Sequence, residues 1–293
     1  MNTKAEQIVL NPNMIEFFQN HLYEKESAAG TVHKYIRDIK EFYRYLDGNN
    51  EISKRHILSY KKLLIEKYAS SSVNTILAAL NQFLEFLGLG NFKVKRLKIQ
   101  KQMFLDREKE MTKSEYERLR EAAKRKQKYQ LALIIETLAS TGARVSELAY
   151  FSIERIRSGK IEIVNKGKRR ILLLAKSLQK KLIYFSKIKG IKNGCVFVTR
   201  SGRPKNRSNI WKEMKKLAVD AGVDVNKIFP HNLRHLFART YYQLTRDLAG
   251  LADLLGHSSL DVTRIYTAES GNVFRQNMER MGLIKLERYK DIE

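Results

Sequence analysis

Six polar side chains in the second half of the chain are of the types that could together break a phosphodiester bond without a metal ion. The last two are His257, which directly follows Gly256, the predicted left-handed cap of one helix, and Tyr266, which lies on the next predicted helix. The other four are two arginines, a lysine and a second histidine: Arg144, Lys166, His231 and Arg234.

Each of these residue types has a defined part in such a reaction. The phenolate of Tyr266 can attack phosphorus and form a phosphotyrosyl intermediate, which conserves the energy of the broken bond for rejoining. Arginine guanidinium groups are planar and permanently charged, so they can hold the negative charge that builds on the non-bridging oxygens. A hairpin lysine can protonate the leaving 5′ oxygen, and a histidine can accept the phenol proton or donate a hydrogen bond to the phosphate. Taken singly, each residue has an ordinary structural explanation, but the combination along one domain favours this chemistry.

The predicted elements place the arginines and His231 at the starts of helices. A buried helix from Tyr129 to Leu138 breaks at residues 140–144, so Arg144 begins the next helical segment. Glu147, three residues on, could orient Arg144 or could form a plain surface pair with it. His231 and Arg234 follow a proline at spacing i, i+3, so one helix face presents both.

Alternating apolar residues predict a β-hairpin between these helices. Its strands are Ile161–Val164 and Arg170–Leu174, joined by Asn165–Arg169. The lysine of this loop that could act as the general acid is Lys166 or Lys168. The other elements expected in this half are a capping-box helix from Thr112, a helix from Ser177, a short strand at Val196–Thr199, a long helix from Ser208 to Ala221, a helix over 246–255, the helix carrying Tyr266, and an amphipathic helix with Phe274, Met278 and Met281.

The first half of the chain shows helical periodicity and no strand pattern. Four short helices within the first hundred residues predict a compact all-α domain. Their outward faces are basic, and such faces either contact DNA or are simply solvated: Lys34, Arg37, Lys40, Arg44, Lys61 and Lys62. The pattern fades after Asn91, in a segment rich in lysine and arginine. We therefore expect a helical domain at 1–90, a basic linker at 91–110 and a catalytic domain at 111–293.

Composition favours a polyanion as the partner. The 293 residues carry 56 Lys+Arg against 31 Asp+Glu, a net charge of +25. The single cysteine, Cys195, excludes an intramolecular disulfide framework and a Cys-rich metal site. The N-terminus lacks the apolar core of a signal peptide, and no apolar run is long enough to span a membrane, so a cytoplasmic protein without a membrane partner is expected.

Three segments resemble the conserved boxes of the tyrosine recombinase (phage integrase) family. They are residues 140–148 (STGARVSEL), 230–239 (PHNLRHLFAR) and 254–267 (LLGHSSLDVTRIYT). The size and two-domain layout are similar to the compact Xer-type branch. The resemblance implies a mainly α fold with a small β-sheet, in which a helical core-binding (SAM-like) domain precedes a mixed α/β catalytic domain.

The resemblance also implies a role for each site residue and a set of partners. Arg144 and Arg234 would clamp the scissile phosphate, Lys166 would be the general acid, His231 the general base or a phosphate ligand, His257 a phosphate hydrogen-bonder and Tyr266 the nucleophile. The family acts on double-stranded DNA as a clamp and as a homotetramer on synapsed sites, with or without a partner recombinase or accessory protein. Its C-terminal helix docks on a neighbouring protomer.

The expected function is therefore site-specific DNA recombination through a 3′-phosphotyrosyl intermediate, with neither ATP nor metal as a cofactor. Two alternatives are a type IB topoisomerase, which uses similar residues, and a DNA-binding regulator without catalysis. The helical N-terminal domain and the His257 box argue against the first, and the retention of all six polar residues argues against the second. The hairpin loop is one residue shorter than the common Xer-type pattern, and residues 241–250 are closer to integrases of mobile elements.

Overall fold

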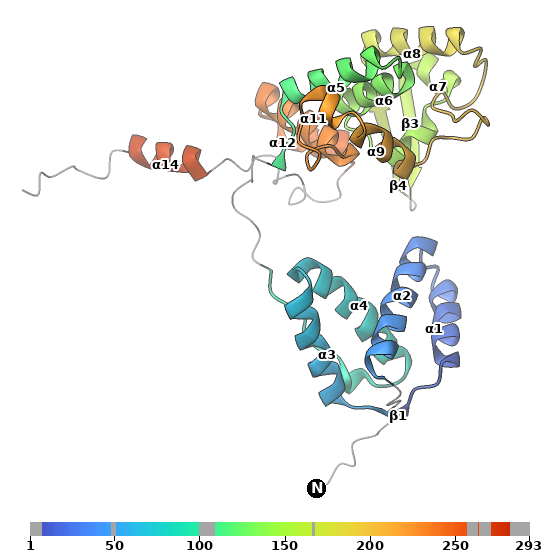
Figure 1. Ribbon diagram of the computed structural model, residues 1–293, viewed down its shortest axis with the longest axis vertical. Coiled ribbons are helices and arrows are strands. Elements are labelled where there is room, and N and C mark those ends of the chain that lie inside the picture. Colours follow the sequence, from blue (N-terminus) through green and yellow to red (C-terminus); the bar gives the residue numbers. More distant parts are fainter. Residues whose placement is uncertain are drawn as a thin grey trace, which may run out of the picture. The chain divides into compact units, whose positions relative to one another are not determined.

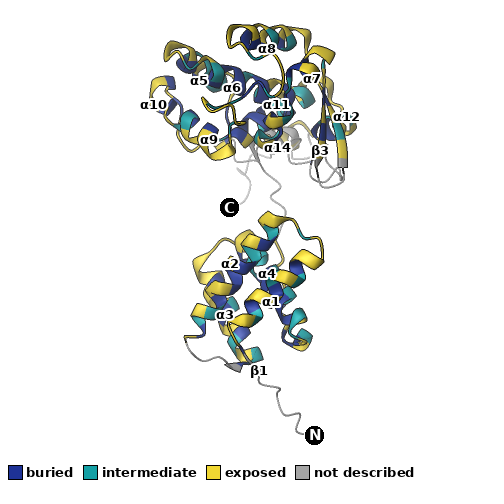
Figure 2. Ribbon diagram, turned by 90° about the vertical axis from the view of Figure 1, so that its right-hand side faces the viewer, coloured by how far each residue is buried: buried dark blue, intermediate teal, exposed yellow. Residues whose placement is uncertain are grey.

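The computed structural model describes residues 8–47, 51–99, 109–165, 168–256, 263 and 271–281. The chain divides into two compact units, Met1–Lys101 and Gln102–Glu293 (Figure 1). Most of the described residues are helical, and the strands are few and short, which confirms the predicted fold class. In each unit the buried faces of the helices turn toward one another (Figure 2).

Four helices form the first unit: α1 (Asn13–Glu24), α2 (Ala29–Tyr45), α3 (Lys54–Lys67) and α4 (Ser70–Phe86). Their apolar stripes meet in one core, where the rings of Phe18 and Phe83 lie edge to face at 5.1 Å. Helical periodicity thus predicted all four helices. It did not predict the short pairing of β1 (Ile8–Val9) with β2 (Glu51–Ile52), because a two-residue strand has no period to detect.

The segment that follows α4 is held against this unit by two asparagines. After the short helix η1 (Gly90–Phe92), Asn81 donates to the carbonyl of Val94 (2.8 Å) and accepts from its N–H (2.9 Å). Asn74 does the same for Leu97, at 2.9 and 2.7 Å. Residues 91–99 belong to the linker predicted from the sequence. Hydrogen bonds at Val94 and Leu97 hold this part of it against the helical unit.

The second unit is built around the buried helix α6 (Tyr129–Thr141), which packs against α5 (Lys113–Arg125) and α11 (Pro230–Thr245). Beyond α6 lie η3 (Val145–Tyr150), α7 (Ile153–Ser158), and a hairpin of β3 (Lys160–Asn165) and β4 (Lys168–Leu173). The remaining elements are α8 (Lys176–Ile188), α9 (Arg207–Lys215), α10 (Ala218–Ala221), α12 (Leu248–Leu255) and α14 (Gly271–Arg280).

Two predicted elements of this unit differ from the structure. The stretch 196–199 makes a single isolated bridge, between Val198 and Pro204, and is not a strand. The helix expected from Ser208 to Ala221 is broken after Lys215, because an i to i+3 bond from Leu217 N–H to Met214 O (3.0 Å) tightens the chain there. This turn buries Leu217 completely.

No helix within the described ranges combines the length and the apolar character needed to cross a bilayer. The capping box predicted at Thr112 is present and begins α5. Met278 of α14 and Met281, which directly follows the helix, are 60% and 62% exposed.

Candidate active site

Arg144 lies at the turn between α6 and η3. Gly142 ends α6 with a φ of +62°, and a Cβ at this position would lie 2.5 Å from the ring of Phe237, so both backbone and packing require glycine. The chain then turns so that the Arg144 N–H donates to Glu147 Oε2 (2.7 Å) and its Nη1 donates to Oε1 of the same carboxylate (3.0 Å). Glu147 is only 2% exposed, whereas Arg144 is 37% exposed. Glu147 is thus a buried group that orients Arg144, and the surface-pair alternative is wrong.

Arg234 lies in the first turns of α11 and is 1% exposed. Its Nη1 donates to the carbonyl of Gly142 (2.6 Å) and its Nη2 to the carbonyl of Leu255 (2.7 Å). The guanidinium therefore connects the turn before Arg144 to the end of α12. The contact of Arg234 with a phosphate stays a prediction. The structure adds a second role, in which the buried guanidinium holds the turn at Gly142 and the end of α12 together.

His231 precedes Arg234 by one turn on α11, and its side chain is accessible to solvent although neighbouring groups surround part of it. Its ring lies 4.9 Å from that of His235, in an edge-to-face arrangement. Desolvation by the surrounding groups lowers the pKa of His231 from 6.5 to about 4, and nearby positive groups contribute further. Those groups are His235, Arg234, Arg144 and Arg207. His231 is therefore neutral at pH 7 and able to accept a proton or a hydrogen bond.

The hairpin brings a third arginine into the site. Arg170 of β4 is paired with Ile163 in the register, on the same side of the hairpin as the buried Leu172. Its Nη2 binds Glu147 Oε2, and its Nη1 donates to the carbonyl of Leu254 (2.9 Å). Burial is the main cause that lowers the pKa of Arg170, but an arginine stays charged over the whole physiological range.

Three of the six predicted residues, Lys166, His257 and Tyr266, lie outside the described residues. Lys168, the alternative general acid, begins β4 directly after the loop. His257 follows Gly256, which ends α12 with a φ of +62° as predicted. The structure therefore brings together Arg144, His231 and Arg234, and it describes β3 and α12, which precede Lys166 and His257.

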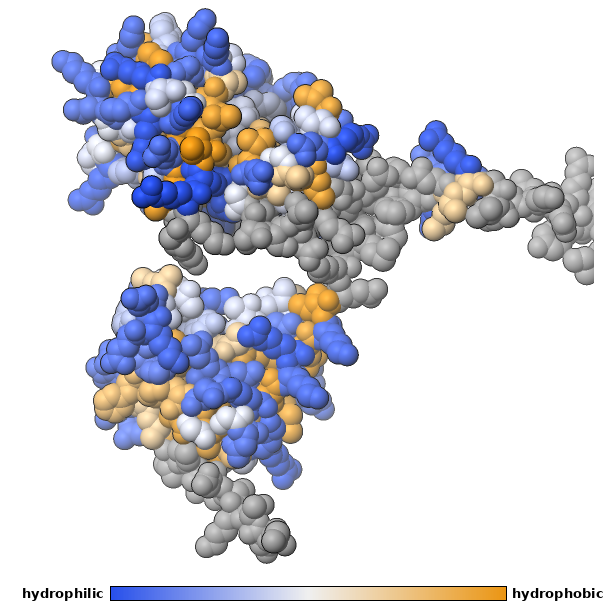
Figure 3. Space-filling view, turned by 180° about the vertical axis from the view of Figure 1, so that it is seen from behind, coloured by the Kyte–Doolittle hydropathy of each residue, from blue (hydrophilic) through white to orange (hydrophobic). Residues whose placement is uncertain are grey.

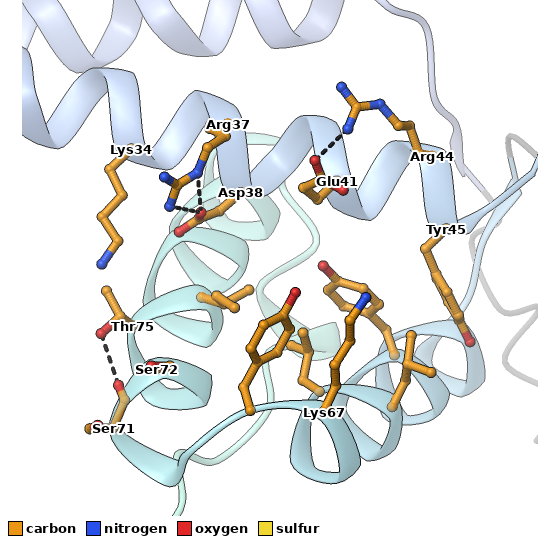
Figure 4. A pocket seen from close by; sticks show the side chains of 15 residues that line it. Lys34, Arg37, Asp38, Glu41, Arg44, Tyr45, Lys67, Ser71, Ser72 and Thr75 are labelled. Carbon is orange, nitrogen blue, oxygen red and sulfur yellow. Dashed lines mark hydrogen bonds and ion pairs between the residues drawn. The ribbon is translucent and has the colours of Figure 1, made fainter.

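The first unit carries a separate basic cleft of about 750 Å³ between α2, α3 and the start of α4 (Figure 4). Lys34 extends from α2 toward Thr75 of α4, and Lys67 extends from α3 toward α2. The two arginines of the cleft are each paired with an acid on α2, Arg37 with Asp38 (2.9 Å) and Arg44 with Glu41. Lys34 and Lys67 have no such ion pair among the described residues. This cleft is a candidate surface of the helical unit for contact with a polyanion.

Sequence reasoning missed Arg170 as a member of the site. The available signal was the period of the strand, which puts residue 170 on the same face as the buried Leu172. A charged residue at an inward position needs a buried partner. Nothing in the local sequence, however, identifies that partner as Glu147, 23 residues earlier, or as Leu254, 84 residues later.

Comparison with known proteins extends these observations over the whole chain. Residues 109–272 match the phage integrase family, and residues 15–89 match the N-terminal SAM-like domain of phage integrases. The tyrosine recombinase XerA of Pyrococcus horikoshii is 26% identical over 291 residues, which cover 96% of this chain and 98% of that protein. The tyrosine recombinase XerD of Halalkalibacterium halodurans is 27% identical, with 88% of this chain and 93% of that protein covered.

Solved structures share the fold. A lambda integrase dimer bound to a COC′ core site superposes with a TM-score of 0.70 and 19% identity, covering 89% of this chain and 77% of that one. The XerH site-specific recombinase bound to difH substrate gives a TM-score of 0.65 and 20% identity, with 97% and 91% covered. The match at 109–272 spans more than half of the chain. It contains the three sequence segments 140–148, 230–239 and 254–267. The protein belongs to the phage integrase family of tyrosine recombinases.

Proposed function

We propose that this protein is a site-specific recombinase of double-stranded DNA, which cleaves and rejoins strands through a 3′-phosphotyrosyl intermediate. The observation that carries the proposal is the convergence of Arg144, Arg234 and His231. Arg234 holds the turn that presents Arg144, and both arginines are close enough to His231 to lower its pKa. The reaction needs neither ATP nor metal, because the phosphotyrosyl bond keeps the energy for rejoining.

Each proposed role follows from the chemistry of the side chain. Arg144, the more exposed arginine, binds the non-bridging oxygens of the scissile phosphate, and Arg234 adds a buried positive charge behind it. His231 is neutral at pH 7 and so can take the phenol proton of Tyr266. Lys166, or Lys168 in its place, protonates the leaving 5′ oxygen, and His257 donates a hydrogen bond to the phosphate.

The charge balance of the described site suits one phosphodiester. Arg144, Arg170 and Arg234 carry three positive charges; Glu147 carries one negative charge bonded to Arg144 and Arg170, and Arg234 is bonded to backbone carbonyls. A neutral His231 adds none, so an excess positive charge is available for the phosphate and for the charge that develops on it.

The partners belong to the proposal as well. Residues 1–90 would form the core-binding domain and 111–293 the catalytic domain, joined by 91–110, and DNA would lie against the basic cleft of the helical unit. We propose a homotetramer on synapsed sites, acting with or without a partner recombinase or accessory protein. The exposed Met278 of α14 and Met281 just after it fit a segment that docks on a neighbouring protomer. Integration, excision, inversion and dimer resolution are all outcomes of this chemistry.

The first test is the covalent intermediate. Wild type and Tyr266→Phe are incubated with labelled, nicked duplexes that tile the flanks of the protein's own gene, and the products are separated under denaturing conditions. We expect a protein–DNA adduct with wild type at one site and none with Tyr266→Phe.

Three results would count against parts of the proposal. An adduct that survives in Tyr266→Phe would exclude Tyr266 as the nucleophile. Tight DNA binding without any adduct, on every duplex tested, would favour the non-catalytic regulator. Relaxation of supercoiled DNA without exchange between two sites would favour the topoisomerase.

A further inference from the structure

The guanidinium of Arg170 is bonded to two separate pieces of the site. The side chain is 11% exposed, and it reaches from β4 to the carboxylate of Glu147 and to the carbonyl of Leu254. These partners belong to η3 and α12, which are far apart in the sequence. Arg170 thus ties the hairpin to both elements at once.

The end of α12 is held by two arginines together. The last carbonyls of a helix have no partner within the helix, and cationic donors there are stabilising. Leu254 O accepts from Arg170 Nη1 (2.9 Å), and Leu255 O accepts from Arg234 Nη2 (2.7 Å). Two adjacent carbonyls are therefore fixed by side chains from β4 and α11, immediately before Gly256.

Arg170 and Arg144 share one carboxylate. Glu147 Oε1 accepts from Arg144 Nη1, and Oε2 accepts from the Arg144 N–H and from Arg170 Nη2. Because Glu147 is 2% exposed, water cannot replace a lost partner without opening the site. Removal of Arg170 would leave the carboxylate free to turn toward Arg144 and to draw its guanidinium away from the phosphate.

The side chain of Arg170 lies directly beside Gly256. A Cβ on Gly256 would collide with Cδ of Arg170, and the φ of +62° also favours glycine. The glycine therefore lets the Arg170 side chain lie close to the cap of α12, and a larger residue at 256 would have to displace it.

From these contacts we infer that Arg170 is a positioning residue of the recombination site, which sets the direction of Arg144 through Glu147 and fixes the end of α12. The inference rests on the proposed function, since it assigns Arg170 to the cleavage step. Arg170 contacts no substrate atom in this role. Its effect is on the rate of strand cleavage and not on the affinity for DNA.

The test compares single-turnover cleavage of nicked DNA by wild type, Arg170→Ala, Arg170→Lys and the control Arg169→Ala. Arg169 is the neighbouring residue on β4, has the same charge and is exposed. We expect Arg170→Ala to cleave about 100-fold more slowly, in line with the cost of a misplaced catalytic group, with the Kd for DNA within about threefold of wild type. Arg170→Lys keeps the charge but has one nitrogen in place of a fork, so an intermediate rate is expected, and Arg169→Ala should cleave like wild type.

A double-variant cycle separates positioning from a general loss of structure. In an Arg144→Lys background the bond between the Arg144 guanidinium and Glu147 is already lost, so adding Arg170→Ala removes mainly the contact with the end of α12 and should slow cleavage by clearly less than the about 100-fold expected in wild type. Thermal unfolding is followed for every variant. If Arg170→Ala does not fold, Arg170→Lys carries the same comparison.

Each outcome bears on one of the two proposals. Wild-type cleavage rates for Arg170→Ala or, where it does not fold, Arg170→Lys would overturn the positioning role while leaving the recombinase proposal intact. So would effects of Arg170→Ala and Arg144→Lys that simply multiply. Absence of any adduct with wild type on the tiled duplexes would instead count against the proposed function.

Discussion

Among the single residues of the site, the carboxylate of Glu147 is the central group. It is buried and bonded to two guanidinium groups and one backbone N–H. A buried carboxylate is costly unless its charge is compensated, and Arg144 and Arg170 compensate it here. The same bonds fix the direction of Arg144, so stability and orientation of the site depend on one residue.

Glu147→Gln is expected to lower the free energy of unfolding by about 3 kcal/mol, the lower end of the range for breaking a buried ion pair. The lower end applies because the partly exposed Arg144 can turn to solvent, whereas Arg170 cannot. Urea denaturation measures the change. Glu121→Gln is the control, because Glu121 pairs with Arg120 and Lys124 at the surface, where such pairs contribute at most about 1 kcal/mol. Equal effects of the two substitutions would contradict the buried role of Glu147.

The lowered pKa of His231 gives a prediction for pH dependence. Its native pKa of about 4 lies below the 6.5 of an unperturbed histidine, so between pH 6.5 and 4 the unfolded chain binds a proton that the native protein does not. The stability that this histidine contributes is therefore present above pH 6.5 and lost as the pH falls toward 4. We expect its imidazole resonance, assigned by its absence in His231→Gln, to titrate well below 6.5 in an NMR experiment. A midpoint at or above 6.5 would exclude His231 as a group kept neutral by the site.

The sequence singled out candidate residues whose roles stay predictions, and it did not show their surroundings. The types and order of Arg144, His231 and Arg234 indicated the chemistry, because that chemistry restricts which side chains can serve. Their partners depend on contacts across long stretches of chain, such as Arg234 with Leu255 and Arg170 with Glu147, and local patterns do not encode these. The burial of Arg234 is likewise a property of the assembled unit.

Among the elements, those with a strong local signal were predicted and those without one were not. The capping box at Thr112 and the alternation around the hairpin specify α5, β3 and β4 from a few neighbouring residues. No proline or glycine marks the break after Lys215. The break forms because burial of Leu217 stabilises a tighter turn. Tertiary packing decides such boundaries.

The C-terminal cap of α12 gives a prediction at this scale. Gly256→Ala and Gly222→Ala both place a side chain at a left-handed position, with φ of +62° and +58°, and each should lose about 1 kcal/mol of stability for that reason. A Cβ at Gly222 meets nothing within 4 Å, whereas one at Gly256 displaces Arg170. Only Gly256→Ala should therefore also lose strand cleavage, as measured on nicked DNA beside urea denaturation. Equal cleavage by both variants would show that the Arg170 contact is dispensable.

The two asparagines that hold residues 94–97 give a second prediction for an element. Asn81→Ala removes both side-chain bonds to Val94, so the amides around this residue should exchange with deuterium faster while those of α1 to α3 keep their protection. Hydrogen exchange followed by mass spectrometry measures this. Thr75→Ala on the same helix is the control, because the Thr75 hydroxyl donates only within α4, to Ser71 O (2.9 Å). Unchanged exchange at 94 in Asn81→Ala would mean that other contacts fix the segment.

For the molecule as a whole, the dominant property is its charge. Hydrophilic side chains cover most of the visible face of each unit (Figure 3). Because the net charge is +25, the long-range electrostatic field of the protein attracts a polyanion. Not every cation is available for this purpose. Lys61 donates to the carbonyl of Lys95 (2.7 Å) and so braces the segment after α4, and Arg37 and Arg44 are paired with acids. The lysines of the cleft, Lys34 and Lys67, are the better candidates for phosphate contacts.

Binding to duplex DNA should consequently depend steeply on salt. A protein that makes 6–10 phosphate contacts loses about 10³-fold or more in affinity between 50 and 200 mM salt, because each contact releases a condensed counterion. Lys34→Ala and Lys67→Ala should each reduce the slope of log K against log salt by about 1 and weaken binding equally for all sequences. Fluorescence anisotropy with a labelled duplex measures the slope. Lys124→Ala on α5 should leave it unchanged, because Glu121 already balances the charge of Lys124 (3.0 Å). If the slope falls with Lys124→Ala but not with Lys34→Ala or Lys67→Ala, the DNA contact does not lie in the cleft. The slope decides this because it counts the counterions that phosphate contacts release, whereas exposure of a lysine does not show a contact.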